Sequence, residues 1–341
     1  KMFGKDHSAV ATSVNNLAAL YEKKGDYRRA EQGYVRALDI RERTLGQDHP
    51  DVASSLNNLG LLYANNGDFA RAAPLYRRAL AIDEKVFGEN HPYLATSLNN
   101  QAALYAAQGD YVRAESFYQR ALTIQEKALG SDHLDVGITI NNLAHLYSVK
   151  GDYVRAEPLY QQALVIFEKR LGKEHVNVAT TLNNLAELSA AKGDYARADR
   201  LFQLSLAILE KTLGKVHPHV AKVRNNVAGL YLSRGDYTRA EVYYGQALAS
   251  MEHSLGPNHP EVAIALNNLA LLYYKKGDLA RAEPLLQRAI SSMERALGPE
   301  HREFGNALGN LAGLYDAMGD DSRSESYYRR ALGIVEKAVG I

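Results

Sequence analysis

The sequence predicts an all-α protein made of eight stacked helix-turn-helix repeats, with about sixteen helices in all. A Gly-Asp pair recurs at a constant spacing, and the same apolar pattern is repeated around every pair. A repeat of this length and regularity indicates hairpin units that stack on one another as a single array over residues 1–341. The glycine of each pair stands at position 25, 67, 109, 151, 193, 235, 277 or 319.

Each repeat predicts two amphipathic helices. In the second repeat, Leu56, Leu59 and Tyr63 recur at three- and four-residue steps, which place them on one face of a helix. Ala72 and Tyr76 begin a second run with the same steps. No stretch shows the alternating pattern of a strand, so we expect two helices and no sheet in each repeat.

The residues between the two runs predict a tight turn. Gly67 tolerates the positive φ that ends a helix, and the carboxylate of Asp68 is suited to cap the amides of the next helix. We therefore expect the two helices to pack antiparallel. His91 and Pro92 mark the start of the following repeat, because proline fits the first turn of a helix.

Composition excludes several classes of protein. With 46% hydrophobic and 23% charged residues, and no run of about 18 apolar residues, the chain is neither a membrane protein nor disordered. It has no cysteine, which rules out disulfides and sulfur-ligated zinc and suits a reducing compartment, so we expect it in the cytoplasm. The net charge of +1 gives no field that would attract nucleic acid or an anionic membrane.

The two ends of the sequence resemble interruptions of the repeat. Residues 1–8 match the linker at residues 43–50, and the last residues stand where a further linker would begin. There is no initiator methionine and no signal peptide. We expect a segment of a longer protein whose effector domain lies elsewhere. The eighth repeat departs most from the pattern, at Gly309, Asp321 and Ser324, which is typical of a capping repeat.

Comparison among the repeats separates variable positions from constant ones. The position of Ala19 changes from repeat to repeat, whereas a pair of asparagines is kept. A carboxamide both donates and accepts hydrogen bonds, as a protein partner must if it recognises a peptide backbone of any sequence. The second asparagine is present in all eight repeats: Asn16, Asn58, Asn100, Asn142, Asn184, Asn226, Asn268 and Asn310. The first is present in seven: Asn15, Asn57, Asn99, Asn141, Asn183, Asn225 and Asn267.

These residues resemble a known family. The spacing of the leucine, glycine, tyrosine and alanine positions is similar to the tetratricopeptide repeat fingerprint, as in Leu56, Leu59, Gly60, Tyr63, Gly67, Ala72, Tyr76 and Ala79. The longer unit, with its Leu-Asn-Asn-Leu-Ala and His-Pro-x-Val-Ala stretches, resembles the kinesin light chain class over essentially the whole chain, and its uniformity is similar to that of bacterial and cyanobacterial relatives. It lacks the heptad coiled coil of true kinesin light chains, and Gly-Asp replaces their Gly-Lys.

The resemblance implies a right-handed α-α superhelix, a solenoid whose first helices line a concave groove that holds an extended peptide of a partner protein. The first asparagine shares a stripe with the residues four and seven further on, such as Leu61 and Ala64, and this stripe matches the groove-facing positions of the family. We therefore expect the first asparagines to contact peptide. For the second asparagines we expect mainly a role in pinning adjacent helices, with ligand contact as the alternative.

The candidate peptide-binding residues are therefore Asn15, Asn57, Asn99, Asn141, Asn183, Asn225 and Asn267, with Asn58, Asn100, Asn142, Asn184, Asn226, Lys222 and Lys275. The rest of the stripe is small and neutral, and its candidate cations are far apart in the array: Lys23, Lys222, Arg224 and Lys275. We expect a peptide of neutral or mixed charge, since a strongly acidic ligand would require more cations.

The other recurring polar residues indicate structural roles. One histidine stands in each linker, at position 7, 49, 91, 133, 175, 217, 259 or 301, without the spacing of a metal site, so we expect hydrogen bonding or packing. An arginine series beginning at Arg29 and a glutamate series beginning at Glu42 predict solvated faces and ion pairs between repeats. Because every conspicuous polar residue is periodic, no catalytic constellation emerges, and we expect neither an enzyme nor a cofactor.

Two functions from different classes remain. The first is a scaffold that binds an extended peptide through the asparagines of a concave groove. The second is a spacer or self-association module that presents an effector domain and associates through the ends of the array.

Overall fold

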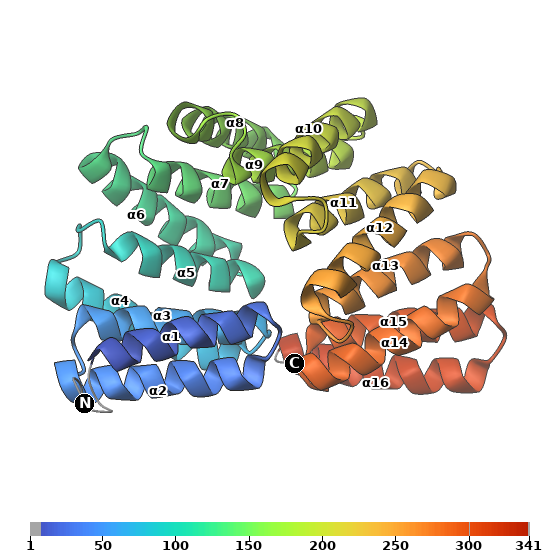
Figure 1. The fold of residues 1–341 in the computed structure, drawn as a ribbon, viewed down its shortest axis with the longest axis horizontal. Helices are drawn as coiled ribbons and strands as arrows, with labels where there is room; N and C mark the ends of the chain where they lie inside the picture. Colours follow the sequence, from blue (N-terminus) through green and yellow to red (C-terminus); the bar gives the residue numbers. More distant parts are fainter. Residues whose placement is uncertain (1–7, 300, 340–341) are drawn as a thin grey trace. The chain divides into compact units, whose positions relative to one another are not determined.

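The structure is a computed structural model that describes residues 8–299 and 301–339, in which sixteen α-helices follow one another in eight hairpins without any strand (Figure 1). This confirms the predicted all-α architecture of eight helix-turn-helix repeats. The helices are α1 (Ser8–Lys23), α2 (Tyr27–Leu45), α3 (Pro50–Asn65), α4 (Phe69–Phe87), α5 (Leu94–Ala107), α6 (Tyr111–Leu129), α7 (Leu134–Val149), α8 (Tyr153–Leu171), α9 (Val176–Ala191), α10 (Tyr195–Leu213), α11 (Pro218–Ser233), α12 (Tyr237–Leu255), α13 (Pro260–Lys275), α14 (Leu279–Leu297), α15 (Arg302–Ala317) and α16 (Asp321–Val339).

The helices fall into two compact units. Unit 1 comprises Lys1–Lys173 and contains α1 to α8, and unit 2 comprises Glu174–Ile341 and contains α9 to α16. Inside each unit, the two helices of a hairpin pack on each other, and the second helix also packs on the first helix of the following hairpin. The single domain over residues 1–341 stays a prediction.

The turns inside the hairpins form as predicted. Gly67 has φ of 71°, in the left-handed region that glycine occupies without strain. Asp68 then caps α4, because its Oδ1 accepts a hydrogen bond from the backbone amide of Arg71 at 3.0 Å. The same carboxylate cap recurs at Asp26, Asp110, Asp152, Asp194, Asp236, Asp278 and Asp320.

Linker histidines cap the first helix of six hairpins, α3, α7, α9, α11, α13 and α15. The Nδ1 of His49 accepts a hydrogen bond from the backbone amide of Asp51 at 3.1 Å, so the ring takes the place that a serine or aspartate side chain usually fills. His7 lies outside the described residues. The predicted hydrogen-bonding role is thereby confirmed for His49, His91, His133, His175, His217, His259 and His301.

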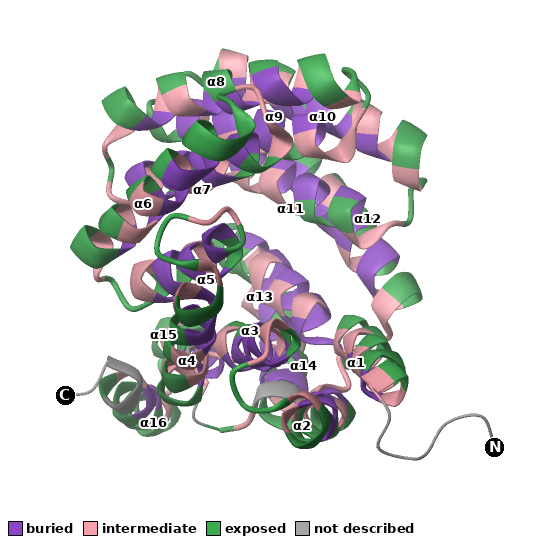
Figure 2. Ribbon diagram, turned by 90° about the vertical axis from the view of Figure 1, so that its left-hand side faces the viewer, coloured by how far each residue is buried: buried purple, intermediate pink, exposed green. Residues whose placement is uncertain are grey.

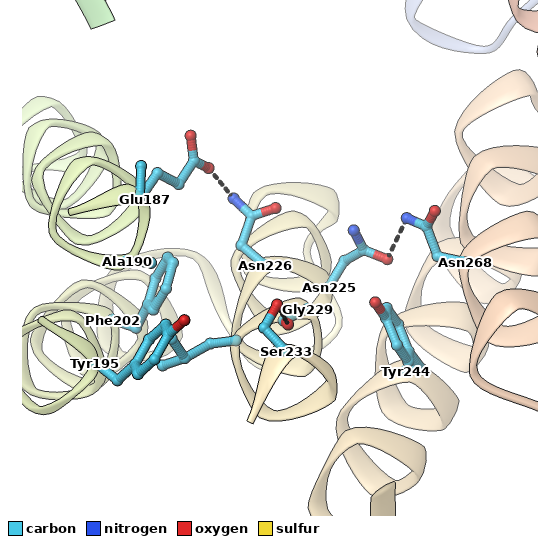
Figure 3. A pocket seen from close by; sticks show the side chains of 12 residues that line it. Glu187, Ala190, Tyr195, Phe202, Asn225, Asn226, Gly229, Ser233, Tyr244 and Asn268 are labelled. Carbon is cyan, nitrogen blue, oxygen red and sulfur yellow. Dashed lines mark hydrogen bonds between the residues drawn. The ribbon is translucent and has the colours of Figure 1, made fainter. Parts of the chain in front are cut away.

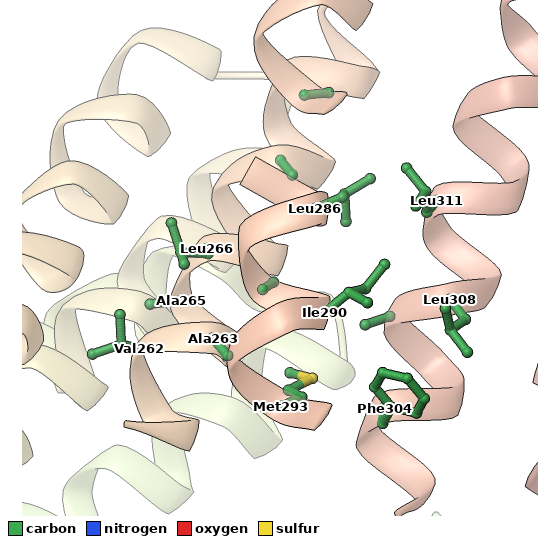
Figure 4. Packing of buried hydrophobic residues seen from close by; sticks show 14 of the residues in the cluster. Val262, Ala263, Ala265, Leu266, Leu286, Ile290, Met293, Phe304, Leu308 and Leu311 are labelled. Atoms are coloured by element: carbon green, nitrogen blue, oxygen red, sulfur yellow. The ribbon is translucent and has the colours of Figure 1, made fainter. Parts of the chain in front are cut away.

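Small residues allow the helices of a hairpin to approach closely. Ala72 and Ala79 are fully buried on the inner face of α4. Larger side chains fill the space between neighbouring hairpins, as Ile290 of α14 and Phe304 of α15 do in unit 2 (Figure 4). The buried residues run as stripes along the helices, with exposed residues on the opposite sides (Figure 2). These stripes match the apolar periodicity of the sequence.

A tyrosine, an arginine and a glutamate join successive repeats at the hairpin turns. The guanidinium of Arg71 lies 4.2 Å above the centre of the Tyr63 ring and bonds both Asp68 and Glu31, the latter from the preceding repeat. The Tyr63 hydroxyl donates to the same Glu31 carboxylate at 2.7 Å. The arrangement recurs at Arg155, Arg281 and Arg323.

Ion pairs between repeats are present, as predicted. The two periodic series, however, do not pair with each other. Glu42 and Glu84 do not pair with the arginine series of the turns. They bond Arg78 and Arg120 of the following repeats, at 2.6 and 2.7 Å. These pairs lie near the surface, where each contributes about 0–1 kcal/mol.

Burial sets the pH range over which two of the histidine caps are stable. It lowers the pKa of His259 and His301 below the ordinary value of 6.5, because a charged ring would lose hydration in the folded protein. As the pH falls, the unfolded chain therefore binds protons before the folded chain does. The stability contributed by these caps is complete above pH 6.5 and is lost as the pH falls through the folded pKa.

We expect the urea midpoint of unfolding to decrease when the pH is lowered from about 7.5 to about 5.5, the range in which histidine titrates. A variant with His259→Asn and His301→Asn keeps a capping side chain that does not titrate, so its midpoint should decrease less over the same range. Far-UV circular dichroism measures both curves. Equal decreases for the variant and the unmodified chain would contradict the histidine-cap account.

Candidate functional site

The recurring asparagines bond one repeat to the next. In unit 1, Nδ2 of Asn58 donates to Oδ1 of Asn15 at 3.0 Å, which joins the second asparagine of one repeat to the first asparagine of the repeat before. The pinning role expected for the second asparagine is therefore present, and the first asparagine is its acceptor. The same bond recurs from Asn100 to Asn57, Asn226 to Asn183, Asn268 to Asn225 and Asn310 to Asn267.

In unit 1, the amides of Asn57 and Asn99 are used as well, whereas Nδ2 of Asn15 has no partner among the described residues. Asn57 is only 8% exposed, and its Nδ2 donates to the Ser97 hydroxyl of the next repeat at 2.9 Å. Ser97 in turn donates to the buried Asp83 carboxylate at 2.6 Å. Burial raises the pKa of Asp83, and the bond from Ser97 opposes that shift. The amide of Asn57 thus serves the packing of two helices.

Asn99 follows the same pattern one repeat later. Its Nδ2 donates to the Thr139 hydroxyl at 2.9 Å, and that hydroxyl donates to the buried Gln125 side chain at 2.7 Å. The Oδ1 of Asn99 is buried without a hydrogen-bond partner, so the chain of asparagine bonds is interrupted there. The structure leaves Asn141, Asn142 and Asn184 half-buried.

From the sixth repeat onward, the hydroxyl that receives this amide is absent. The position two residues before the first asparagine of each pair is serine or threonine up to residue 181 and then becomes Val223, Ala265 and Ala307. As a result, Nδ2 of Asn225 and Nδ2 of Asn267 have no hydrogen-bond partner among the described residues. Oδ1 of each still accepts its inter-repeat bond. Asn225 and Asn267 therefore each retain a free donor, whereas Nδ2 of Asn183 donates to Glu187. The loss of the hydroxyl is a sequence signal that the repeat period alone does not reveal.

The candidate cations fall into two groups. Lys222 on α11 and Lys275 on α13 are exposed and form no ion pair within residues 8–299 and 301–339. Lys23, at the end of α1, is exposed as well. Arg224 is not a groove cation, contrary to the sequence-based expectation. It is buried, and its guanidinium bonds Glu210 at 2.6 Å and the Ser250 hydroxyl at 3.1 Å.

The reason for the burial of Arg224 lies in its repeat position. It occupies the position of the core residues Leu56 and Leu266, and Ser250 occupies the position of Ile82 and Ile124 on the second helix. A long polar side chain and a short polar side chain have replaced two apolar ones. Both departures are visible in the sequence, but their pairing requires knowledge of which positions face each other.

A pocket of about 430 Å³ opens on the first helices of unit 2, beside the free donor of Asn225 (Figure 3). Glu187 of α9 stands at one side, and Asn268 of α13 at the other. Gly229 of α11 has no side chain, which leaves the pocket open above Phe202 and Tyr244. The pocket is lined by Glu187, Ala190, Ala191, Tyr195, Phe202, Asn225, Asn226, Gly229, Leu230, Ser233, Tyr244 and Asn268.

Glu187 gives the pocket a negative charge held by amides. Its Oε1 accepts a hydrogen bond from Nδ2 of Asn183 at 3.0 Å and another from Nδ2 of Asn226. Loss of hydration raises the pKa of the Glu187 carboxyl, and these two amides, together with the charge of Lys222, act in the opposite direction. The carboxylate is thus held in place on one side of the pocket.

The chain shows a clear match to one family of repeats. The tetratricopeptide repeat profile matches seven overlapping segments: residues 8–85, 56–127, 93–169, 135–211, 177–253, 219–295 and 261–337. The chain belongs to the tetratricopeptide repeat family. No curated protein matches it in sequence.

Solved structures of tetratricopeptide arrays are similar to this chain. BtubC (BKLC) from P. vanneervenii is 27% identical with a TM-score of 0.56, over 68% of this chain and 93% of that one. A variant of a putative kinesin light chain from Podosopora anserina, with nearly identical TPR-like repeats, is 28% identical with a TM-score of 0.50, over 60% and 97%. A Rap protein complexed with competence and sporulation factor shares the fold at 15% identity, with a TM-score of 0.63 over 98% and 99%.

Two negative features of the described residues concern metals and membranes. No group of three or more histidine, cysteine, aspartate or glutamate side chains in them is arranged to hold a metal ion. None of the helices α1 to α16 combines the length and the apolar character needed to cross a lipid bilayer.

The two classes of asparagine should differ in their effect on stability. Asn57→Ala removes the donor to Ser97 and the acceptor of Asn100, so we expect a loss of about 1–3 kcal/mol in the free energy of unfolding. Asn267→Ala removes only the acceptor of Asn310, so its loss should be smaller, about 0.5–1.5 kcal/mol. Urea denaturation of the two variants measures the difference. A larger loss for Asn267→Ala would contradict the assignment of free and used amides.

Proposed function

We propose that this tetratricopeptide array binds an extended peptide segment of a partner protein, and that the first helices of unit 2 form the principal binding surface. Arrays of this family serve protein-protein interaction, and the observation that carries the finer proposal is the free Nδ2 of Asn225 and of Asn267. A donor on a half-buried side chain that has no partner among the described residues is suited to a main-chain carbonyl oxygen.

Acceptors lie beside these donors. The carboxamides of Asn226 and Asn268 use their Nδ2 groups between repeats, so each retains Oδ1 for a main-chain amide of the peptide. Donor and acceptor thus alternate along α11 and α13. Each such bond contributes about 0.5–1.5 kcal/mol net, so a useful affinity needs several repeats and therefore an extended ligand.

The charge of the surface favours a neutral or mixed peptide. Lys222 and Lys275 are cationic and Glu187 is anionic, and all three belong to the first helices of unit 2. The Rap structure, of the same fold, is solved with the competence and sporulation factor, which supports the capacity of such an array to hold a partner. The absence of cysteine suits a reducing compartment, so we place the binding in the cytoplasm.

The test is selection of random dodecapeptides displayed on phage, followed by affinity measurement with one selected peptide. The double variant Asn225→Ala with Asn267→Ala should bind that peptide about tenfold or more weakly, because two main-chain hydrogen bonds are lost. The control is Asn57→Ala with Asn99→Ala, which removes amides already used inside unit 1 and should leave the affinity of unit 2 unchanged. Equal affinities for the Asn225/Asn267 variant and the unmodified chain would overturn the proposal.

A second candidate function is self-association, and the exposure of α16 favours it. Tyr328 is 48% and Leu332 is 58% exposed, whereas Tyr76 and Leu80, at the equivalent positions of the second repeat, are buried in clusters that include residues of the following repeat. On α1, Leu17 and Leu20 are exposed in the same way. Complementary apolar surfaces of this kind can join copies head to tail.

If copies associate through these surfaces, the molar mass measured by light scattering should increase with protein concentration. Tyr328→Ser with Leu332→Ser should abolish that increase without changing the melting temperature, since both side chains are already exposed. A constant monomer mass over the whole concentration range would exclude self-association through α16.

A further inference from the structure

We propose that the pocket between Glu187 and Asn268 binds the side chain of a lysine or arginine residue of the bound peptide. The inference rests on the proposed peptide-binding function and specifies it: the asparagines hold the main chain, and the pocket selects one cationic side chain. It would be the position at which an otherwise sequence-tolerant surface discriminates between peptides.

Two neighbouring repeats depart from the pattern of the groove stripe. At the variable position of the groove stripe, Glu187 is the only carboxylate among the eight repeats, and Gly229 follows it in the next repeat. One repeat thus supplies a charge, and the next omits a side chain beside it. The corresponding positions in the other repeats are Ala19, Leu61, Ala103, His145, Leu271 and Gly313.

The Glu187 carboxylate keeps one oxygen without an internal partner. Both amides that bond it, those of Asn183 and Asn226, donate to the same oxygen, Oε1, and Oε2 has no partner in the described residues. An exposed carboxylate with one oxygen free of internal partners favours an ammonium or guanidinium group. Lys222 influences Glu187 electrostatically but forms no ion pair with it in the described structure, so it leaves Oε2 accessible.

Tyr244 lines the pocket and offers a hydroxyl to a ligand. Tyr244 is only 4% exposed, and its hydroxyl has no hydrogen-bond partner among the described residues, although burial raises its pKa to about 12 and keeps it protonated. Figure 3 shows this hydroxyl directed toward Asn225 and Asn268 at the pocket. A hydroxyl that lines the pocket and has no internal partner can accept a hydrogen bond from a ligand cation.

The aromatic rings complete the fit to a long cationic side chain. Tyr195 is 39% exposed and lines the pocket on the side of α10 together with the buried Phe202. The Tyr195 ring offers apolar surface to the methylene groups of lysine or arginine and a π face to its charged end. An apolar ligand side chain would leave the Glu187 carboxylate without a partner, and an acidic one would be repelled by it. A cationic side chain satisfies the carboxylate, the hydroxyl and the rings together.

The experiment uses the full chain and the phage-displayed dodecapeptides. Peptides selected by the unmodified chain should share a lysine or arginine at one position. One such peptide is then synthesised with that residue and with norleucine in its place, which keeps the methylene groups and removes the charge. Norleucine should weaken binding to the unmodified chain about tenfold, and should weaken binding to Glu187→Gln much less, because the charge partner is already absent.

A second variant tests the shape of the pocket. Gly229→Leu fills it with a residue that Leu61 and Leu271 carry at the equivalent position, so the fold tolerates the change. It should weaken the lysine or arginine peptide about tenfold. Ala103→Leu makes a similar change at the same repeat position in unit 1 and should have no effect. Both variants are checked by thermal unfolding.

The outcomes separate the pocket from the wider proposal. Selected peptides without a shared basic residue, or an equal norleucine effect in the unmodified chain and in Glu187→Gln, would overturn the cationic pocket and leave peptide binding intact. If the unmodified chain selects no peptide over the Asn225→Ala/Asn267→Ala variant, both the pocket and the proposed function are overturned.

Discussion

The hydrogen bond between asparagines of successive repeats is the interaction on which the candidate site depends. Apolar packing holds the hairpins together, but it tolerates small shifts, whereas the bond from Asn58 to Asn15 or from Asn268 to Asn225 requires a defined register between two first helices. It also orients both carboxamides. The atoms that this bond leaves free are therefore presented in a fixed direction, before any ligand arrives, which reduces the entropic cost of binding.

One position in the following repeat decides whether Asn57, Asn99, Asn225 and Asn267 use their amides inside the protein. Where that position carries a hydroxyl, as at Ser97 and Thr139, the first asparagine donates its amide to the next helix. Where it carries Ala265 or Ala307, the amides of Asn225 and Asn267 have no partner among the described residues. The same hydrogen-bond donor can thus serve either stability or recognition. At Asn225 the internal bond from this donor is missing, and this residue also lines the pocket that contains Glu187.

Much of the fold followed from the sequence, because its determinants are local. Gly67 and Asp68 fix the turn by conformation and capping, and the apolar steps fix the helix faces. The site was less predictable. Periodicity shows which residues share a helix face, but it does not show which residues of the neighbouring helices lie opposite that face. The sequence therefore predicts a ligand contact for Asn57 and a groove cation for Arg224, whereas in the structure they bond Ser97 and Glu210. The pocket depends on Glu187 and Gly229, which break the repeat and so have no periodic signature.

The most direct measurement of the central claim is a crystal structure of the chain with a peptide selected by it. The account predicts an extended peptide on α11 and α13, with main-chain carbonyl oxygens within hydrogen-bond distance of Nδ2 of Asn225 and Nδ2 of Asn267. A peptide bound elsewhere, or bound in unit 2 without main-chain contacts to these two amides, would contradict it.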